Sequence, residues 1–171
     1  MKTAFRNLRR LPFTTILAAY KYGHNNIYVP ESTKVGAKLC MAILRGDNLE
    51  MKNLLAQGAP LNHQDDPDGW TPLFYSIYYD NYHAREIILA LGADIHQTDY
   101  SKRTSLMIAA IRDDSDLLLQ LIQKGVDVTA RDHKGKSALD FAVEYNSQKC
   151  IRILAEYDQA ENSRYYSRNA V

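Results

Sequence analysis

Three closely spaced aspartates, Asp113, Asp114 and Asp116, are the residues whose type and spacing most directly suggest metal chemistry. Carboxylate oxygens suit calcium, but a calcium-binding loop also needs an internal glycine and a glutamate at its end. The three aspartates match only a fragment of that pattern. We therefore interpret them as a solvated turn between helices.

Catalytic motifs are missing from the sequence. There is no Gly-rich phosphate loop, no G-x-S-x-G and no His-x-x-x-His, and the five histidines are scattered along the chain. Cys40 and Cys150 have neither C-x-x-C spacing nor clustered histidines, so we expect no disulfide and no zinc site. The sequence predicts a protein that is not an enzyme and holds no cofactor. Two unpaired thiols predict a reducing compartment, the cytoplasm, or the host cytosol if the protein is a secreted effector.

The chain is organised by a repeat of constant period, since the interval from Thr71 to Thr104 equals the interval from Thr104 to Ser137. The best copy contains D-P-D-G-W-T-P-L and ends in G-A-D, and an earlier partial copy begins near Ala37. Such a period indicates stacked units that cannot bury their apolar faces alone. The same interval separates Leu73, Leu106 and Leu139, and also Asp66, Asp99 and Asp132.

The motif D-x-x-G-x-T-P-L, followed by an apolar run and G-A-D, resembles the ankyrin repeat over residues 37 to 158. The resemblance implies an all-α solenoid of about four helix-turn-helix repeats. We expect the repeats at residues 37–65, 66–98, 99–131 and 132–158, after a basic helical extension at 1–36 and before a polar tail at 159–171. The histidine that the family has after T-P-L is replaced by Phe74, Met107 and Asp140, so we expect lower stability than in a consensus stack.

The residues predict the same helices without the family name. Thr71, Thr104 and Ser137 are suited to cap helix starts, because their hydroxyls can accept a bond from an unpaired backbone N–H. Glycines that follow apolar runs favour helix ends, because a residue with positive φ commonly stands there. The small residues of the first helices should allow close approach between copies. The glycines are Gly58, Gly92 and Gly125, and the small residues are Ala42, Ser76, Ala109 and Ala142.

Two departures from the repeat stand out in and before the second copy. The interval from Gly58 to Gly92 exceeds the interval from Gly92 to Gly125 by a single residue, so the finger loop before Trp70 should differ in shape from the others. Arg85 stands where the other copies have apolar residues, and its charge needs an acidic partner or a path to water. A role for Arg85 in binding is the alternative.

Charge is unevenly distributed along the chain. Residues 1–36 carry six Lys/Arg against one acidic residue, whereas residues 37–158 carry 13 Lys/Arg against 18 Asp/Glu. Nucleic-acid binding by the repeats is therefore not expected, because phosphate contacts need a basic stripe. No apolar run reaches the roughly 20 residues of a membrane helix, so no transmembrane segment is expected.

The resemblance implies a partner protein that binds along finger tips and first helices. Trp, Tyr and Arg dominate binding hot spots, because each desolvates a large area and keeps a polar handle. The alternative for the tyrosines is packing between copies. Transferred position by position, the candidates are Trp70, Tyr78, Tyr79, Tyr100, Arg103, Ile111, Arg112, His133, Lys136, Tyr145 and Arg45.

These features predict a monomeric, non-enzymatic protein-interaction module that acts as an inhibitor, an adaptor or a pathogen effector. The alternative function is a targeting module, whose basic N-terminal extension would bind an anionic membrane or a nucleic acid.

Overall fold

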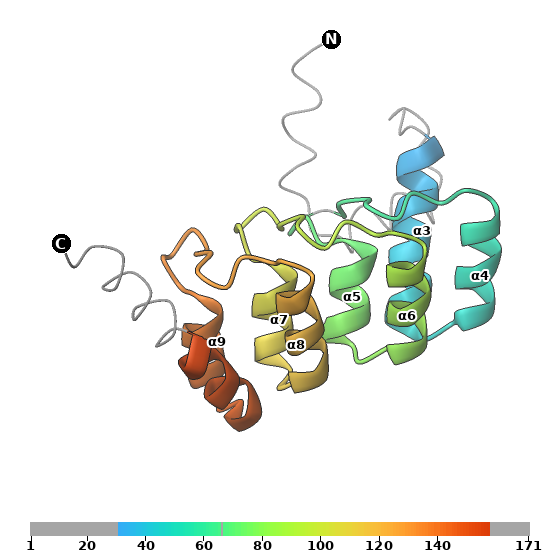
Figure 1. Cartoon of the computed structure of the whole chain (residues 1–171). Coiled ribbons are helices and arrows are strands. Elements are labelled where there is room, and N and C mark those ends of the chain that lie inside the picture. Colours follow the sequence, from blue (N-terminus) through green and yellow to red (C-terminus); the bar gives the residue numbers. More distant parts are fainter. Residues whose placement is uncertain (1–30, 66, 158–171) are drawn as a thin grey trace, which may run out of the picture.

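Helix pairs stand side by side in the computed structural model, which describes residues 31–65 and 67–157 (Figure 1). These residues form an all-α repeat solenoid, as the sequence predicted. The helices are α3 (Glu31–Arg45), α4 (Asn48–Ala56), α5 (Pro72–Tyr78), α6 (Tyr82–Ala90), α7 (Ser105–Ile111), α8 (Ser115–Gln123) and α9 (Ala138–Glu144), and residues 148–157 are also helical.

Two rows of helices make up the stack. Helices α3, α5, α7 and α9 pack against one another in that order and form the inner row. Helices α4, α6 and α8 form the outer row, and each packs on the inner helix that precedes it. The long loops before α5, α7 and α9 lie at one end of the helices (Figure 1); we call residues 57–71, 91–104 and 124–137 the first, second and third fingers.

The predicted helix starts are confirmed. The hydroxyls of Thr71, Thr104 and Ser137 each accept a hydrogen bond from the backbone N–H three residues later. The predicted helix ends are confirmed as well: Gly58, Gly92 and Gly125 follow the outer helices, with φ between 82° and 87°. A residue with a Cβ is strained in this conformation, so glycine is favoured at these positions.

The short turns from inner to outer helices share a backbone conformation that the sequence analysis did not predict. Each turn has one residue with positive φ, and three of the four are not glycine. Asp and Asn tolerate this region better than other residues, because their short side chains bond locally. The four residues are Gly46, Asp80, Asp113 and Asn146.

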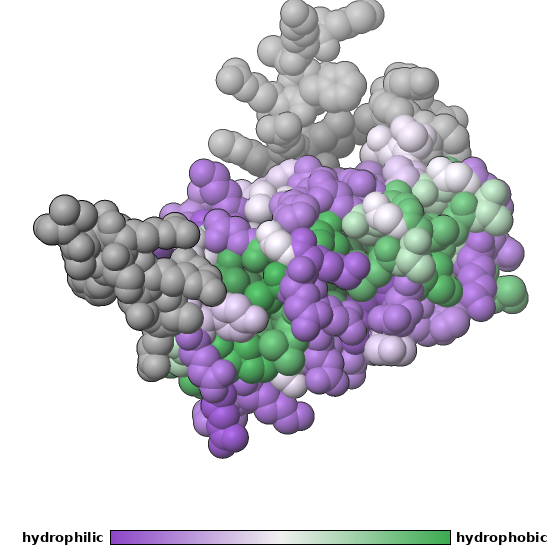
Figure 2. Space-filling view, in the orientation of Figure 1, coloured by the Kyte–Doolittle hydropathy of each residue, from purple (hydrophilic) through white to green (hydrophobic). Residues whose placement is uncertain are grey.

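The core runs along the seam between the inner helices and beneath the outer helices, where Met51, Ile88 and Leu118 are fully buried. The small residues predicted for this seam, Ala42, Ser76, Ala109 and Ala142, are all fully buried. Phe74 and Met107, which replace the family's histidine, are also buried, whereas Asp140 forms a capping box with Ser137. Figure 2 shows hydrophobic residues gathered toward both ends of the visible face, with hydrophilic residues between them.

The first finger differs from the others, as its extra residue predicted. The N–H of Asp65 bonds to the carbonyl of Trp70, whereas Asp99 bonds to Arg103 and Asp132 to Lys136, each across one residue fewer. The constant repeat interval therefore pointed to the wrong aspartate in the second copy. Asp65, not Asp66, is the structural equivalent of Asp99 and Asp132, because the extra residue lies within the turn.

The ends of the chain lie largely outside the described residues. The expected basic extension over residues 1–36 is described only from residue 31, where α3 begins, and the expected tail over 159–171 is not described. The alternative targeting function rests on that extension. No helix among the described residues is long and apolar enough to cross a membrane.

Candidate functional site

Four aromatic rings gather where the first finger meets α5. Tyr75, Tyr78 and Tyr79 share one helix face, because residues three and four apart are neighbours on a helix. Trp70 packs edge-on against Tyr75 and Tyr78, with ring centroids 5.5 and 5.0 Å apart. Tyr79 stacks on Tyr75 at 6.2 Å and meets Tyr78 edge-on at 5.3 Å. We call these four residues the aromatic cluster.

Two arginines of the next repeat extend the aromatic cluster. The guanidinium carbon of Arg103 lies 5.7 Å from the Trp70 ring centroid, and that of Arg112 lies 5.8 Å from the Tyr78 ring centroid. Such cation–π contacts contribute about 0.5–1 kcal/mol each at exposed sites. Arg103 also forms an ion pair with the buried carboxylate of Asp99 at 2.6 Å. The cluster and its arginines therefore join two repeats into one surface.

Beneath the rings, Tyr75 is held by Asp65. The Tyr75 hydroxyl donates a hydrogen bond of 3.0 Å to Oδ2 of Asp65, whose residue is only 5% exposed. Burial, together with the negative charge of Asp65, raises the pKa of Tyr75, so its hydroxyl stays a neutral donor. This bond fixes the ring on which Trp70 and Tyr79 pack.

The Trp70 indole packs against other rings but leaves its N–H donor without a hydrogen bond. Its Nε1 is buried and has no hydrogen-bond partner among the described residues. An unpaired buried donor costs about 1–3 kcal/mol. The aromatic contacts of the ring offset this cost, because such pairs contribute about 0.5–1.5 kcal/mol each beyond their burial.

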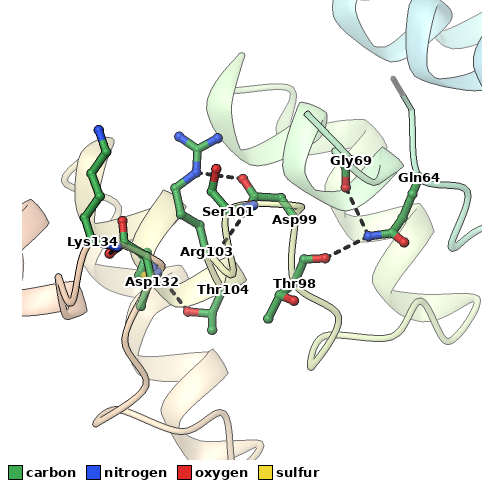
Figure 3. A network of polar contacts seen from close by, with 10 residues as sticks. Gln64, Gly69, Thr98, Asp99, Ser101, Arg103, Thr104, Asp132 and Lys134 are labelled. Carbon is green, nitrogen blue, oxygen red and sulfur yellow. Dashed lines mark hydrogen bonds and ion pairs between the residues drawn. The ribbon is translucent and has the colours of Figure 1, made fainter. Parts of the chain in front are cut away.

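Hydrogen bonds between neighbouring fingers set their spacing. The N–H of Tyr100 bonds to the carbonyl of Asp68, and the N–H of His133 bonds to the carbonyl of Ser101, each at 2.9 Å. Gln64 donates from Nε2 to the carbonyls of Gly69 and Thr98 and so bridges the first two fingers (Figure 3). The finger tips therefore present a preorganised surface.

The candidate residues fall into two groups by contact. Trp70, Tyr78, Tyr79, Arg103 and Arg112 come together in or beside the aromatic cluster. The remaining candidates lie along the same inner helices and fingers. Tyr100 is 47% and Tyr145 54% exposed, Arg45 and His133 are exposed, Ile111 is half-buried, and Lys136 pairs with Glu144 at 2.6 Å.

Sequence reasoning missed Tyr75 and Asp65 as parts of this surface. Tyr75 precedes Tyr78 by three residues and Tyr79 by four, and this helical spacing could have identified Tyr75 as part of the surface. Asp65 was hidden, because the repeat phase selected its neighbour Asp66. For the tyrosines, Tyr78 is half-buried by its packing on Trp70, whereas Tyr79 is 48% exposed and stays a candidate for binding.

Arg85 has the acidic partner that the sequence required. Its side chain is 7% exposed and forms an ion pair with Asp114 of the next repeat. The guanidinium also lies 5.1 Å from the ring centroid of Tyr82. The interpretation of Arg85 as a paired structural residue is confirmed.

Of the three aspartates that first suggested metal chemistry, Asp113 and Asp114 lie in the predicted turn, but Asp116 lies in the first turn of α8. Asp113 and Asp114 are not simply solvated. Oδ1 of Asp113 accepts bonds from the N–H groups of Lys149 and Cys150 at 3.1 Å each. Asp114 caps α8 by accepting the N–H of Leu117, in addition to pairing with Arg85. Both carboxylates therefore connect neighbouring repeats.

Comparison with known proteins finds ankyrin repeats in part of this chain. Residues 86–165 match the model for ankyrin repeats in three copies. Inversin of Canis lupus familiaris is 26% identical over 125 residues, which is 73% of this chain but 12% of that protein. The 2-5A-dependent ribonuclease of Mus musculus is 32% identical over 76 residues, 44% of this chain and 10% of that protein. An ankyrin repeat-containing protein of Treponema pallidum is 27% identical over 116 residues, 68% of this chain and 39% of that protein.

Proposed function

This chain is built of ankyrin repeats, and on that premise we propose that it is a non-enzymatic module that binds a partner protein through its inner helices and fingers. The partner is blocked or positioned by the surface, so the role is that of an inhibitor, an adaptor or an effector. The chain acts as a monomer in the cytoplasm, or in the host cytosol if it is a secreted effector.

The observation that carries the proposal is the aromatic cluster with its two arginines. Tyr79 and Arg112 are exposed, whereas Trp70 and Tyr78 are half-buried and hold them in place. A surface that is already ordered loses less side-chain entropy on binding. Trp, Tyr and Arg are also the residues that contribute most to binding energy, at about 2 kcal/mol or more for the best.

A pull-down from cells of the source organism tests this proposal. The triple variant Trp70→Ala, Tyr79→Ala, Arg112→Ala should lose the partner that the wild type captures. The matched control is Tyr157→Ala, Leu49→Ala, Arg152→Ala, which removes two large exposed side chains and one arginine away from the inner helices and the fingers.

Folding must be separated from binding in this experiment. Trp70 is half-buried and packs against Tyr75, so its loss lowers stability as well as contact area. Tyr79→Ala with Arg112→Ala alone removes only exposed side chains and should keep the fold, as urea unfolding can check. Retention of the partner by this folded double variant and by the triple variant would contradict the proposal.

A further inference from the structure

Near their tips, the second and third fingers each turn one aspartate inward, whereas Asp94 and Asp127, which follow the ends of α6 and α8, are exposed. Oδ1 of Asp99 accepts the N–H groups of Ser101 and Arg103, and Oδ1 of Asp132 accepts those of Lys134 and Lys136. Both aspartates are buried, with 3% and 9% of their surface exposed. Their charge therefore stabilises each loop from within and is not displayed to a partner.

The basic side chains of the same loops point outward. Figure 3 shows the side chains of Arg103 and Lys134 extending to the same side of neighbouring fingers. Lys102 and Lys134 are exposed, and so is Arg112 at the end of α7. Among the described residues, none of Lys102, Lys134 and Arg112 has a carboxylate within ion-pair distance.

Other cations near the tips of these fingers are already neutralised. Arg131 lies 3.6 Å from Asp140, and Lys136 lies 2.6 Å from Glu144. Lys124 lies away from the tips, because it caps the end of α8 at the base of the third finger. We call Lys102, Lys134 and Arg112 the basic strip. Its member Arg112, at the C-terminal end of α7, lies over the ring of Tyr78 in the aromatic cluster.

The exposed charge of the first finger is negative. Asp68 is exposed there, and the finger contains no lysine or arginine. At the finger tips, the exposed charge therefore changes from Asp68 of the first finger to Lys102 and Lys134 of the second and third fingers. The repeats as a whole are acidic, with 13 Lys/Arg against 18 Asp/Glu over residues 37–158, so the basic strip is a local exception.

We propose that the basic strip binds an Asp- or Glu-rich segment of the partner protein, while an apolar side chain of that segment packs on the aromatic cluster. The proposal rests on the proposed function and adds the chemistry of the partner. Complementary charge orients a partner and excludes partners of like charge. The order of charges along the fingers also fixes the direction in which the segment lies.

A nucleic acid fits this surface less well. Its phosphates would need a continuous row of cations, because each neutralised phosphate adds to affinity through counterion release. The basic strip consists of three cations and ends at the acidic first finger. A peptide with a few carboxylates needs only the three cations of this strip.

Selection from a randomised peptide library on the full chain tests the proposal. Enriched peptides should carry an excess of Asp and Glu beside an apolar residue and should quench or shift the fluorescence of Trp70, the one tryptophan of the chain. Lys102→Glu with Lys134→Glu should weaken these peptides about tenfold or more. Lys52→Glu with Lys124→Glu changes net charge equally at exposed positions outside the basic strip and should change affinity less than about twofold.

The outcomes separate this proposal from the proposed function. Peptides that need Trp70 and Tyr79 but show no acidic excess would overturn the acidic partner and leave protein binding in place. Peptides that bind the Trp70→Ala, Tyr79→Ala, Arg112→Ala variant equally well, or no enrichment at all, would count against both. Displacement of the peptides by a polyuridine oligonucleotide at equal concentration would also overturn the acidic-peptide proposal.

Discussion

Arg85 of α6 forms an ion pair with Asp114, the residue that caps the next outer helix, α8. The pair ties two repeats together, and its members differ in exposure: the side chain of Arg85 is 7% exposed and that of Asp114 is 19% exposed. Asp114 performs two tasks, since it also accepts the N–H of Leu117. Loss of either partner should therefore have unequal consequences.

We predict that Asp114→Ala lowers the free energy of unfolding by about 3–5 kcal/mol, because it leaves a buried guanidinium unpaired and α8 uncapped. Arg85→Met should cost less than about 1 kcal/mol, since methionine matches Met51 of the first copy and Asp114 keeps its capping bond. Urea unfolding measures both variants. Equal losses would show that the ion pair, not the buried charge left behind, is what matters.

The seam of small residues gives a second prediction. Ala109 on α7 is fully buried, and α7 packs between α5 and α9. Ala109→Leu should lower the free energy of unfolding by about 1–3 kcal/mol, because the inner helices must separate. Ala90→Leu, at an exposed position of α6, is the matched control and should stay within about 0.5 kcal/mol in urea unfolding. A tolerated Ala109→Leu would mean that the seam is loosely packed.

Much of the fold could be predicted because the repeat places its signals locally. Thr71 caps α5 through a bond to a residue three positions away, so sequence spacing alone identifies it. The partner of Arg85 lies 29 residues away in another repeat, and sequence showed only that some partner was needed. Contacts within one helical turn could be predicted from the sequence, whereas the partners in contacts between repeats could not.

The site was predicted less completely for the same reason. Trp70 and Tyr79 follow from their residue types, but the choice between Asp65 and Asp66 depends on where one extra residue enters a turn. A constant repeat period cannot decide that choice. The burial of the Asp99 carboxylate likewise depends on hydrogen bonds within its loop. The sequence showed only that residues 37–158 are acidic in total, and not that cations are exposed at the finger tips.

The thiol of Cys150 gives a prediction with a pH dependence. Burial, followed by the charge of Asp113, raises its pKa from an ordinary 9.0 to about 12. A raised folded pKa favours the protonated thiol, so its contribution to stability is complete below about pH 9 and is lost as the pH rises toward 12. Both thiols should therefore resist alkylation near neutral pH until the chain unfolds, because burial raises the pKa of Cys40 as well.

Asp113→Asn is the variant that isolates the charge. Asparagine tolerates the left-handed backbone at this position (φ 54°) and can still accept the N–H groups of Lys149 and Cys150. In a Cys40→Ala background, titration of thiolate absorbance should show a lower pKa for Cys150 in this variant. An unchanged titration would mean that burial alone sets the pKa.

The contact between Gly69 and Tyr100 supplies a prediction that separates backbone strain from packing. A Cβ at Gly69 would overlap the Tyr100 ring, whereas a Cβ at Gly92 would meet nothing within 4 Å. Both glycines have positive φ, so alanine at either should cost about 1–2 kcal/mol through strain. Gly69→Ala should cost about 1 kcal/mol more in urea unfolding, because the N–H of Tyr100 is fixed to Asp68 and the ring must rotate away. Combining each variant with Tyr100→Ala completes the double-mutant cycles. The extra cost at Gly69 should vanish in that background, and its persistence would place the strain in the finger backbone instead of the packed ring.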